Sequence, residues 1–255
     1  MNTRKLLLRL AKLFPKKYAK ANHDYVGLMC GKLPMEVNKI VLLLDLDEEV
    51  ADEVIKIKPD LVITHHPFIY GSKAKVLKFN EKKRLLTLKM EENNIPVYSM
   101  HTNFDTGKGG MNDALAKALN LNDIYAPEEF PMMRIGELKE EMDVVSFAKM
   151  TKEAFKVEYS LLIPNGSKTV KKVGIVGGGG SRYWAIARDH GADIYISGDI
   201  PHHARREIVT ANYNFLDMPH EIEHIFMPTL KKILLDIDEN LEIVEIDHEK
   251  LPMVI

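Results

Sequence analysis

The 255-residue chain has almost no cysteine and no long apolar run. Cys30 is the only cysteine, so an internal disulfide and a thiolate zinc cluster are both excluded. No hydrophobic run approaches the length of a membrane span. The start, Met1–Leu8, turns polar too quickly for a secretory signal. By elimination, these absences predict a cytoplasmic location.

The chain also lacks an excess of charge of either sign. Its net charge is -2 at pH 7, which gives no electrostatic footprint for nucleic acid, so no nucleic-acid partner is expected. Hydrophobic residues make up 45% and charged residues 28% of the chain, which is typical of folded domains. The length allows one large domain or two small ones.

What the chain does contain is a buried-strand pattern that ends in two histidines. The apolar run 61–63 leads to His65 and His66, and Pro67 cannot continue a strand ladder. Because neighbouring strand residues point to opposite sides, we expect each histidine to hold a different ion of a metal pair. A polar strand end whose histidines cap backbone groups is the alternative for this pair alone.

Two further strands are predicted to end in polar side chains. The run 40–44 ends at Asp45, and the run 95–100 ends at His101. Residues 48–58 begin with acids and end with lysines, as a helix favours. This strand–helix–strand order predicts parallel strands, whose carboxyl ends meet at the ligand-binding edge of a sheet.

Imidazole and carboxylate side chains are concentrated at these ends and at one predicted helix start. Together they suit zinc, iron, manganese or nickel. Glu223 lies three residues after His220, so both share a face of a helical turn, and Glu223 could bridge two ions. If the register of this turn differs, His224 would take the place of Glu223 as the ligand. The candidate ligands are His65, His66, His101, Asp105, His220 and Glu223.

Two other groups carry chemistry. A glycine run precedes Ser181 between a predicted strand and helix, and its amides could bind phosphate. A tight turn that needs positive φ explains the run equally well. Asp199, with His202 and His203, is either a loop cluster or support for the metal ligands, and we favour support. Asp45 is a further supporting candidate. The predicted phosphate-binding residues are Gly178, Gly179, Gly180 and Ser181.

The chain is expected to form two α/β lobes, residues 1–125 and 126–255, with the last elements packing back on the first lobe. Residues 71–79 are expected to form a loop, and the pattern over 125–172 is unclear apart from a helix at 150–157 and a strand at 159–163. Asn80 and Asn112 are expected to cap helices. The other predicted helices are 6–13, 80–92, 113–119, 182–190 and 225–235, and the other strands are 173–176, 194–197, 214–217 and 241–247.

Nearly the whole chain resembles the NIF-three-like (DUF-thirty-four) family, often labelled GTP cyclohydrolase 1 type 2 homologues. The two most specific motifs are Thr64-His65-His66-Pro67-Phe68 and His101-Thr102-Asn103-Phe104-Asp105. The other matching segments are Asp24–Leu28, 110–115, 177–181, 198–200 and His220-x-x-Glu223.

The resemblance implies two α/β lobes with mostly parallel sheets, a dinuclear metal site in the cleft between them, and toroidal homohexamers. Many members place the glutamate four residues after the last histidine, and a glycine where this chain has Pro219. By motif, His66 and Asp105 would hold one ion, His65 and His220 the other, with Glu223 shared and His101 beside them.

Two functions are compatible with these features. The first is a metal-dependent hydrolase that acts on a nucleotide or phosphoester through metal-activated water. The second is a non-catalytic metal-binding ring that serves as a scaffold or handles metal, because no general acid–base beyond the ligands is evident. The family label suggests GTP, and the residues alone leave the metal, the substrate and the reaction open.

Overall fold

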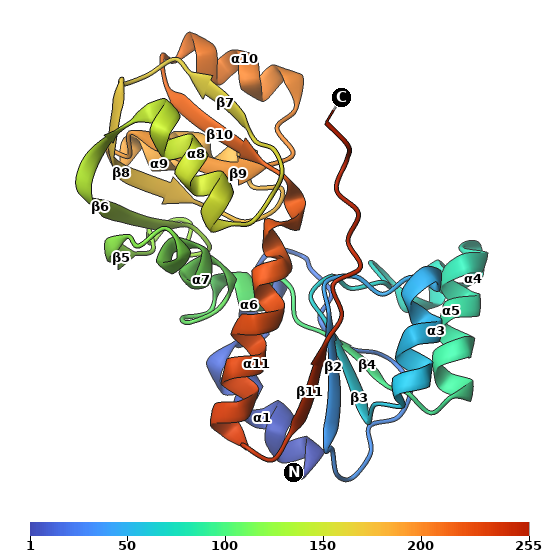
Figure 1. Cartoon of the computed structure of the whole chain (residues 1–255). Helices are drawn as coiled ribbons and strands as arrows, with labels where there is room; N and C mark the ends of the chain where they lie inside the picture. Colours follow the sequence, from blue (N-terminus) through green and yellow to red (C-terminus); the bar gives the residue numbers. More distant parts are fainter. Residues whose placement is uncertain (255) are drawn as a thin grey trace. The chain divides into compact units, whose positions relative to one another are not determined.

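The structure is a computed structural model that describes residues 1–254, and it divides into two compact units (Figure 1). Unit 1 comprises Met1–Lys108 and Phe226–Glu249. Unit 2 comprises Gly109–Ile225 and the C-terminal residues from Lys250. The predicted boundary after residue 125 therefore lies inside unit 2, and residues 226–249 return to unit 1.

Unit 1 is built on a five-stranded sheet with the order β1-β4-β3-β2-β11. The neighbours β11, β2, β3 and β4 are parallel, as predicted for the strands before Asp45 and His65, and β1 is an antiparallel edge strand. The strands are β1 Gly27–Cys30, β2 Lys39–Leu43, β3 Leu61–Thr64, β4 Val97–Ser99 and β11 Glu242–Glu245.

Helices cover both faces of this sheet. Asn80 caps its helix as predicted, since its side chain accepts a hydrogen bond from the Lys83 amide at 3.0 Å. Residues 73–79 form a helix where a loop was predicted. None of the residues of this helix is buried, so the sequence lacks the apolar stripe by which a helix is recognised. The helices are α1 Thr3–Leu13, α2 Lys17–Ala21, α3 Glu48–Ile57, α4 Lys73–Phe79, α5 Glu81–Glu92, α6 Thr102–Thr106 and α11 Phe226–Ile237.

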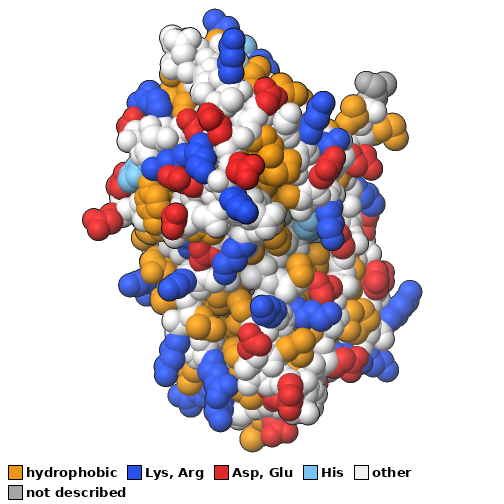
Figure 2. Space-filling model, turned by 60° about the vertical axis from the view of Figure 1, so that its left-hand side comes forward, with side chains coloured by type: hydrophobic (Ala, Val, Ile, Leu, Met, Phe, Trp, Pro, Cys, Tyr) orange, Lys and Arg blue, Asp and Glu red, His pale blue; other side chains and the backbone are white. Residues whose placement is uncertain are grey.

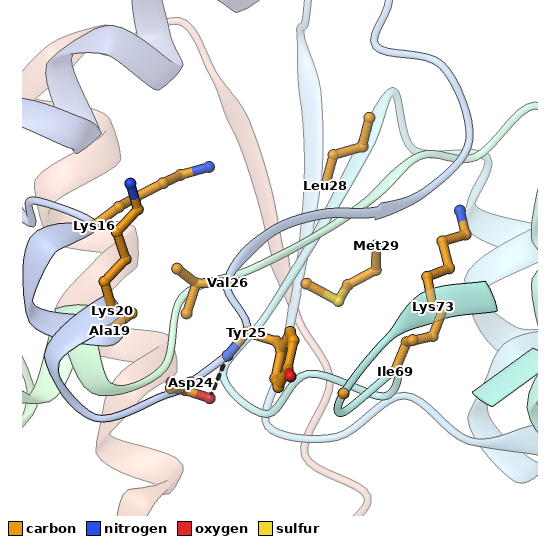
Figure 3. A pocket seen from close by; sticks show the side chains of 11 residues that line it. Lys16, Ala19, Lys20, Asp24, Tyr25, Val26, Leu28, Met29, Ile69 and Lys73 are labelled. Carbon is orange, nitrogen blue, oxygen red and sulfur yellow. Dashed lines mark hydrogen bonds between the residues drawn. The ribbon is translucent and has the colours of Figure 1, made fainter. Parts of the chain in front are cut away.

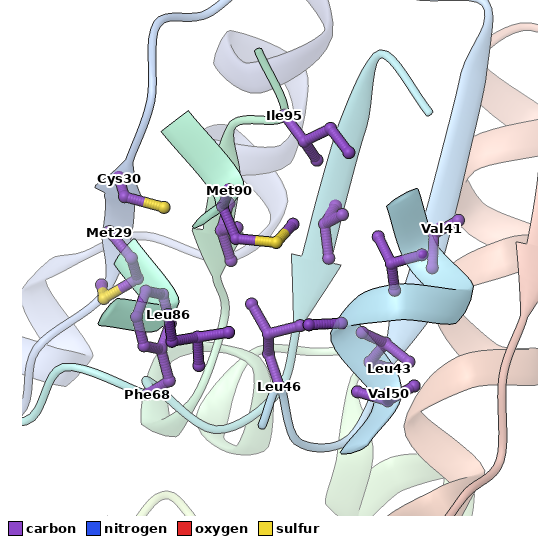
Figure 4. Close-up of a cluster of buried hydrophobic side chains, with 14 of the residues drawn as sticks. Met29, Cys30, Val41, Leu43, Leu46, Val50, Phe68, Leu86, Met90 and Ile95 are labelled. Atoms are coloured by element: carbon purple, nitrogen blue, oxygen red, sulfur yellow. The ribbon is translucent and has the colours of Figure 1, made fainter. Parts of the chain in front are cut away.

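One layer of the core fills the space between the sheet and helices α3 and α5 (Figure 4). Val50 of α3 and Met90 of α5 pack here with Val41 and Leu43 of β2. Burial raises the pKa of the Cys30 thiol to about 12, so this thiol is an inert core side chain.

On the other face of the sheet, three phenylalanines connect α1, α6 and α11. The ring centroids of Phe14 and Phe104 lie 4.7 Å apart, and those of Phe104 and Phe226 lie 5.1 Å apart. All three side chains are fully buried, which stabilises the fold by roughly 1.5–3 kcal/mol each. This packing holds α6, which carries Asp105, in a fixed position beside the strand ends.

Unit 2 contains a six-stranded mixed sheet with the order β5-β6-β8-β9-β10-β7. Only β8, β9 and β10 are parallel, and the other three pairings are antiparallel, so the prediction of mostly parallel sheets is wrong for this unit. Of the antiparallel strands, β7 corresponds to the strand predicted at 159–163, whereas β5 and β6 were not predicted, because no clear pattern marks residues 122–143. The strands are β5 Asn122–Tyr125, β6 Arg134–Asp143, β7 Leu161–Pro164, β8 Thr169–Ile175, β9 Ile194–Gly198 and β10 Asn214–Met218.

Within the residues that the structure describes, four helices, α7 to α10, and two short 3₁₀ turns complete unit 2. Its core joins Trp184 of α9 and Ile208 of α10 to Tyr195 and Phe215 of the sheet. Asn112 is not a cap, because α7 begins after Gly110 and the Asn112 side chain instead accepts a hydrogen bond from the Gly177 amide. Beyond α7 Met111–Ala118, the remaining elements are α8 Val144–Ala154, η1 Ser181–Tyr183, α9 Trp184–Asp189, α10 His202–Thr210 and η2 His220–Ile225.

The surface carries mixed charge. On the face shown in Figure 2, basic and acidic side chains are interspersed, and small hydrophobic patches lie between them. Among residues 1–254, none of the helices combines the length and the apolar character that crossing a membrane requires.

Candidate metal centre

Three histidines of unit 1 converge beyond the ends of β3 and β4. Each of His65, His66 and His101 offers a ring nitrogen, and these three atoms lie within 4.8 Å of one another. The ring centroids of His65 and His66 are 4.9 Å apart, so the expectation that they point to opposite sides is wrong. The reason is that β3 ends at Thr64, and the alternation of a strand does not extend beyond it.

The rings of His65 and His66 are both oriented through Nδ1. His65 Nδ1 lies 2.9 Å from the carbonyl oxygen of Met100, and His66 Nδ1 lies 2.7 Å from Oδ2 of Asp45. When Nδ1 donates to such an acceptor, Nε2 is the nitrogen that can bind a metal ion. Asp45 therefore has the position of a supporting residue.

His101 is held in the same way by Asp24, which the sequence did not identify as part of the site. His101 Nδ1 lies 2.8 Å from Asp24 Oδ2, which also accepts a hydrogen bond from the Thr102 hydroxyl at 2.7 Å. Burial alone would raise the pKa of Asp24, but its hydrogen bonds and the His101 charge lower it overall. In the sequence, the one indication of this role was that Asp24 begins the family-like segment Asp24–Leu28. It lies 77 residues before His101 and 78 before Thr102, so no local pattern connects them.

Asp105 adds a carboxylate to the histidine group. It lies on α6, is 6% exposed, and places Oδ1 3.5 Å from Nε2 of His65. Imidazoles beside a buried carboxylate form a donor set that suits zinc, iron, manganese or nickel. The side chains present in unit 1 therefore fit a divalent cation.

A second group of donors lies in unit 2, on η2. His220 Nε2 is 3.3 Å from Oε2 of Glu223, which is buried. His220 Nδ1 is 2.6 Å from Oδ2 of Asp199, so Asp199 occupies the same supporting position as Asp24 and Asp45. The hydrogen bond and charge of Glu223, followed by those of Asp199, raise the pKa of His220 to about 9 against the opposing effect of burial.

The glycine run packs directly against this second group. Gly178 has φ +60°, and a Cβ there would overlap Oε1 of Glu223 and lie 3.0 Å from Nε2 of His220. A Cβ on Gly179 would lie 3.3 Å from Oδ2 of Asp199. The amides of Gly177 and Gly180 are used inside the unit, by the Asn112 and Ser197 side chains. Close packing against metal-competent side chains thus accounts for these glycines, and phosphate binding at 178–181 stays a prediction.

Two of the predicted residues, His203 and His224, remain to be placed. His203 is exposed near the start of α10, and His224 is half-buried on η2. Neither belongs to a cluster of candidate ligands within residues 1–254. Glu223, by contrast, lies within 3.3 Å of His220, so the geometry favours it over His224 as the next ligand in the chain.

The sequence matches the model of one family, described as Duf34/NIF3 (NGG1p interacting factor 3), over residues 1–252. A Lactococcus lactis protein called a GTP cyclohydrolase 1 type 2 homolog is 30% identical over 251 residues, which cover 96% of each chain. A Clostridium perfringens protein of the same name is 31% identical over 229 residues, covering 88% of this chain and 86% of its own.

The fold also matches solved structures. A Bacillus cereus protein related to NIF3 superposes with a TM-score of 0.86 at 21% identity, over 100% of this chain and 99% of its own. At that identity the match concerns the fold alone.

Proposed function

We propose that this chain, which belongs to the Duf34/NIF3 family, is a dinuclear metal-dependent hydrolase. One observation carries the proposal: four histidines have Nδ1 next to a carboxylate or carbonyl oxygen, the arrangement typical of metal-binding histidines. A purely structural role would not require the same orientation four times in separate parts of the chain.

By the family motifs, the proposed ligands would be His65, His66 and Asp105, with His101 beside them, together with His220 and Glu223. Two divalent ions, when bound, would lower the pKa of a coordinated water and polarise a substrate oxygen. The pairing of particular residues with particular ions follows the family motifs and remains part of the proposal.

The chain's own residues would prepare this site in three ways. Asp24, Asp45 and Asp199 hold three imidazoles by hydrogen bonds of 2.6–2.8 Å, which fixes the tautomer before any ion binds. Burial of His65 and Asp105 lowers the local dielectric and strengthens their interaction with a cation. The glycine run keeps the backbone close to Glu223 without a clash.

The proposed substrate is a nucleotide or another phosphoester. The support is indirect: the two curated relatives are called GTP cyclohydrolase 1 type 2 homologues, and paired divalent ions suit both ring hydrolysis and phosphoester hydrolysis. Because a shared fold does not fix a reaction, the substrate must be tested directly.

The test combines metal content with turnover. Protein purified without chelators should contain about two divalent ions per chain by elemental analysis and hydrolyse GTP or a model phosphodiester. Asp105→Ala should lose metal and activity together, whereas Asp236→Ala, which removes an exposed carboxylate on α11, should lose neither. Bound metal without turnover of any substrate in a broad panel would support the metal-binding scaffold instead.

The family further suggests a cytoplasmic homo-oligomer, a ring of six chains. Unit 1 supports self-association, because a groove of about 620 Å³ lies between α1 and the edge strand β1. Its walls include exposed Leu8, Leu28 and Met35, the last 86% exposed. Apolar surface of this kind commonly marks a protein interface. Sedimentation should reveal a species of six 29.1 kDa chains, and a monomer at micromolar concentration would contradict this part of the proposal.

A further inference from the structure

A second cavity of unit 1 contains none of the proposed metal ligands. It has a volume of about 270 Å³, slightly below the roughly 300–1,000 Å³ usual for small-molecule sites. Its wall comes from the α2 region, the segment 24–29 and the stretch 69–73. Figure 3 shows Lys16 and Lys20 on one side and Lys73 on the other, with Tyr25, Val26 and Met29 between them.

The cavity concentrates positive charge. Within residues 1–254, none of the three lysines forms an ion pair with an acidic side chain. Burial, followed by the neighbouring charge of Lys20, lowers the pKa of Lys16. The Lys16 ammonium lies against Gly27, where a Cβ would be only 2.5 Å from Nζ. Two ammonium groups that repel each other, with no acidic partner, favour a bound anion.

The one acid in the wall does not cancel this charge. Asp24 lines the cavity, but its carboxylate already accepts hydrogen bonds from the Tyr25 amide, the Thr102 hydroxyl and His101 Nδ1. Its side chain is only 2% exposed, so little of its charge faces the cavity. The exposed cations therefore dominate the electrostatics of the opening.

The cavity also offers a surface for a flat ring. Tyr25 is 42% exposed, and its ring meets that of Tyr70 edge to face, with centroids 5.3 Å apart. Apolar side chains of Ala19, Val26 and Met29 line the wall nearby. An aromatic side chain held against a neighbouring ring is a rigid platform on which a planar ligand can stack.

We propose that this cavity binds a small phosphate-bearing ligand with a planar ring, that is, a nucleotide. Lys16, Lys20 and Lys73 bind the phosphate, and the ring lies against Tyr25. The cavity contains none of the proposed metal ligands. Asp24, however, lines the cavity and is also hydrogen-bonded to His101, so a ligand in the cavity would lie next to the residue that orients His101. The proposal does not depend on hydrolase activity.

The test measures binding directly, by calorimetry with the full-length protein in the presence of a chelator. Removal of free metal ensures that no phosphate binds through a cation. GMP is the probe. Guanosine and inorganic phosphate, which each represent one half of GMP, are measured separately for comparison. We expect GMP to bind more tightly than either half, and its affinity to fall as salt is raised. Lys16→Gln, Lys20→Gln and Lys73→Gln should each weaken GMP about tenfold, the effect of losing one charge-assisted hydrogen bond.

Matched controls lie next to the tested residues. Lys17→Gln removes a cation from the same short helix, but Lys17 lies over Tyr18 and does not line the cavity. Tyr25→Leu should weaken GMP but leave phosphate unchanged, and Tyr70→Leu should have the smaller effect. GMP binding that is absent, equal to phosphate binding, or lowered as much by Lys17→Gln as by Lys16→Gln would overturn the proposal. Loss of turnover with intact GMP binding would instead count against the hydrolase alone.

Discussion

At the scale of single residues, the centre depends on the partners of its imidazoles. Asp45 fixes His66 through a 2.7 Å hydrogen bond, and Asp199 fixes His220 through one of 2.6 Å. Asp199 even adopts a left-handed backbone, with φ 55°, which costs energy in any residue other than glycine. These acids do not need to touch an ion to control how well it binds.

The first residue-scale prediction concerns Asp45. Asp45→Ala should lower divalent-metal affinity roughly 10–100-fold, because His66 loses the acceptor that sets its tautomer. Asp45→Asn, which keeps an oxygen acceptor, should lose less. Metal titration of both variants measures the difference, and Asp52→Ala, an exposed acid on α3, is the control. Equal affinity in Asp45→Ala and the wild type would refute a positioning role.

The second residue-scale prediction concerns the buried ion pair of Arg134 and Asp113. Arg134 Nε donates to Asp113 Oδ1 at 2.6 Å, and the side chains are 5% and 14% exposed. Burial would raise the pKa of Asp113, but the hydrogen bond and charge of Arg134 outweigh it, so the pKa is lowered overall. A lowered folded-state pKa stabilises the protein above the unfolded pKa of about 4 and loses that effect as pH falls.

Asp113→Asn should therefore reduce the free energy of unfolding at pH 7 by about 3–5 kcal/mol, the usual cost of breaking a buried pair. The difference from the wild type should shrink as the pH falls below about 4. Denaturant titrations at pH 7 and pH 3.5 measure both values. A difference that stays constant with pH would show that the Asp113 charge contributes nothing.

At the scale of elements, the loop after β8 determines how the candidate ligands His220 and Glu223 pack. The Gly178 carbonyl accepts hydrogen bonds from the amides of Gly180 and Gly198, at 2.9 and 2.7 Å. This network holds the loop against η2, where His220 and Glu223 lie. The loop is thus part of the packing of the site rather than a separate turn.

The element-scale prediction compares two glycines. Gly178→Ala combines positive φ, worth roughly 1–2 kcal/mol, with a Cβ that displaces Glu223, so it should lower both stability and metal affinity. Gly191→Ala has the same strain, at φ +75°, but no atom within 4 Å of its Cβ. It should lose stability alone. Thermal melts and metal titrations of both variants separate the effects, and equal metal affinity would argue against the packing role of Gly178.

At the scale of the whole molecule, the chain leaves unit 1 at residue 108 and re-enters it at 226. Unit 2 is almost continuous and has its own sheet and core. Unit 1 needs α11, which buries Leu230 and Leu234, and β11, which pairs with β2. The two units therefore differ in their dependence on distant sequence.

This difference predicts the behaviour of fragments. Residues 109–225 alone should fold, with cooperative thermal unfolding followed by circular dichroism. Residues 1–108 alone should not, because the β2 edge and the ring of Phe104 would lose their cover from β11 and Phe226. Cooperative unfolding of the 1–108 fragment would show that α11 and β11 are dispensable.

The sequence by itself determined the βαβ core of unit 1, the helix cap at Asn80 and the residue types available for metal binding, because periodicity and local hydrogen bonds act over a few residues. It did not determine the mixed sheet of unit 2, in which β6 pairs with a strand about 30 residues away. Only the tertiary structure decided that His65 and His66 lie side by side, that Asp24 supports His101, and that the glycine run packs on Glu223. These contacts join residues far apart in the chain, so their geometry depends on how whole elements pack, which no local pattern encodes.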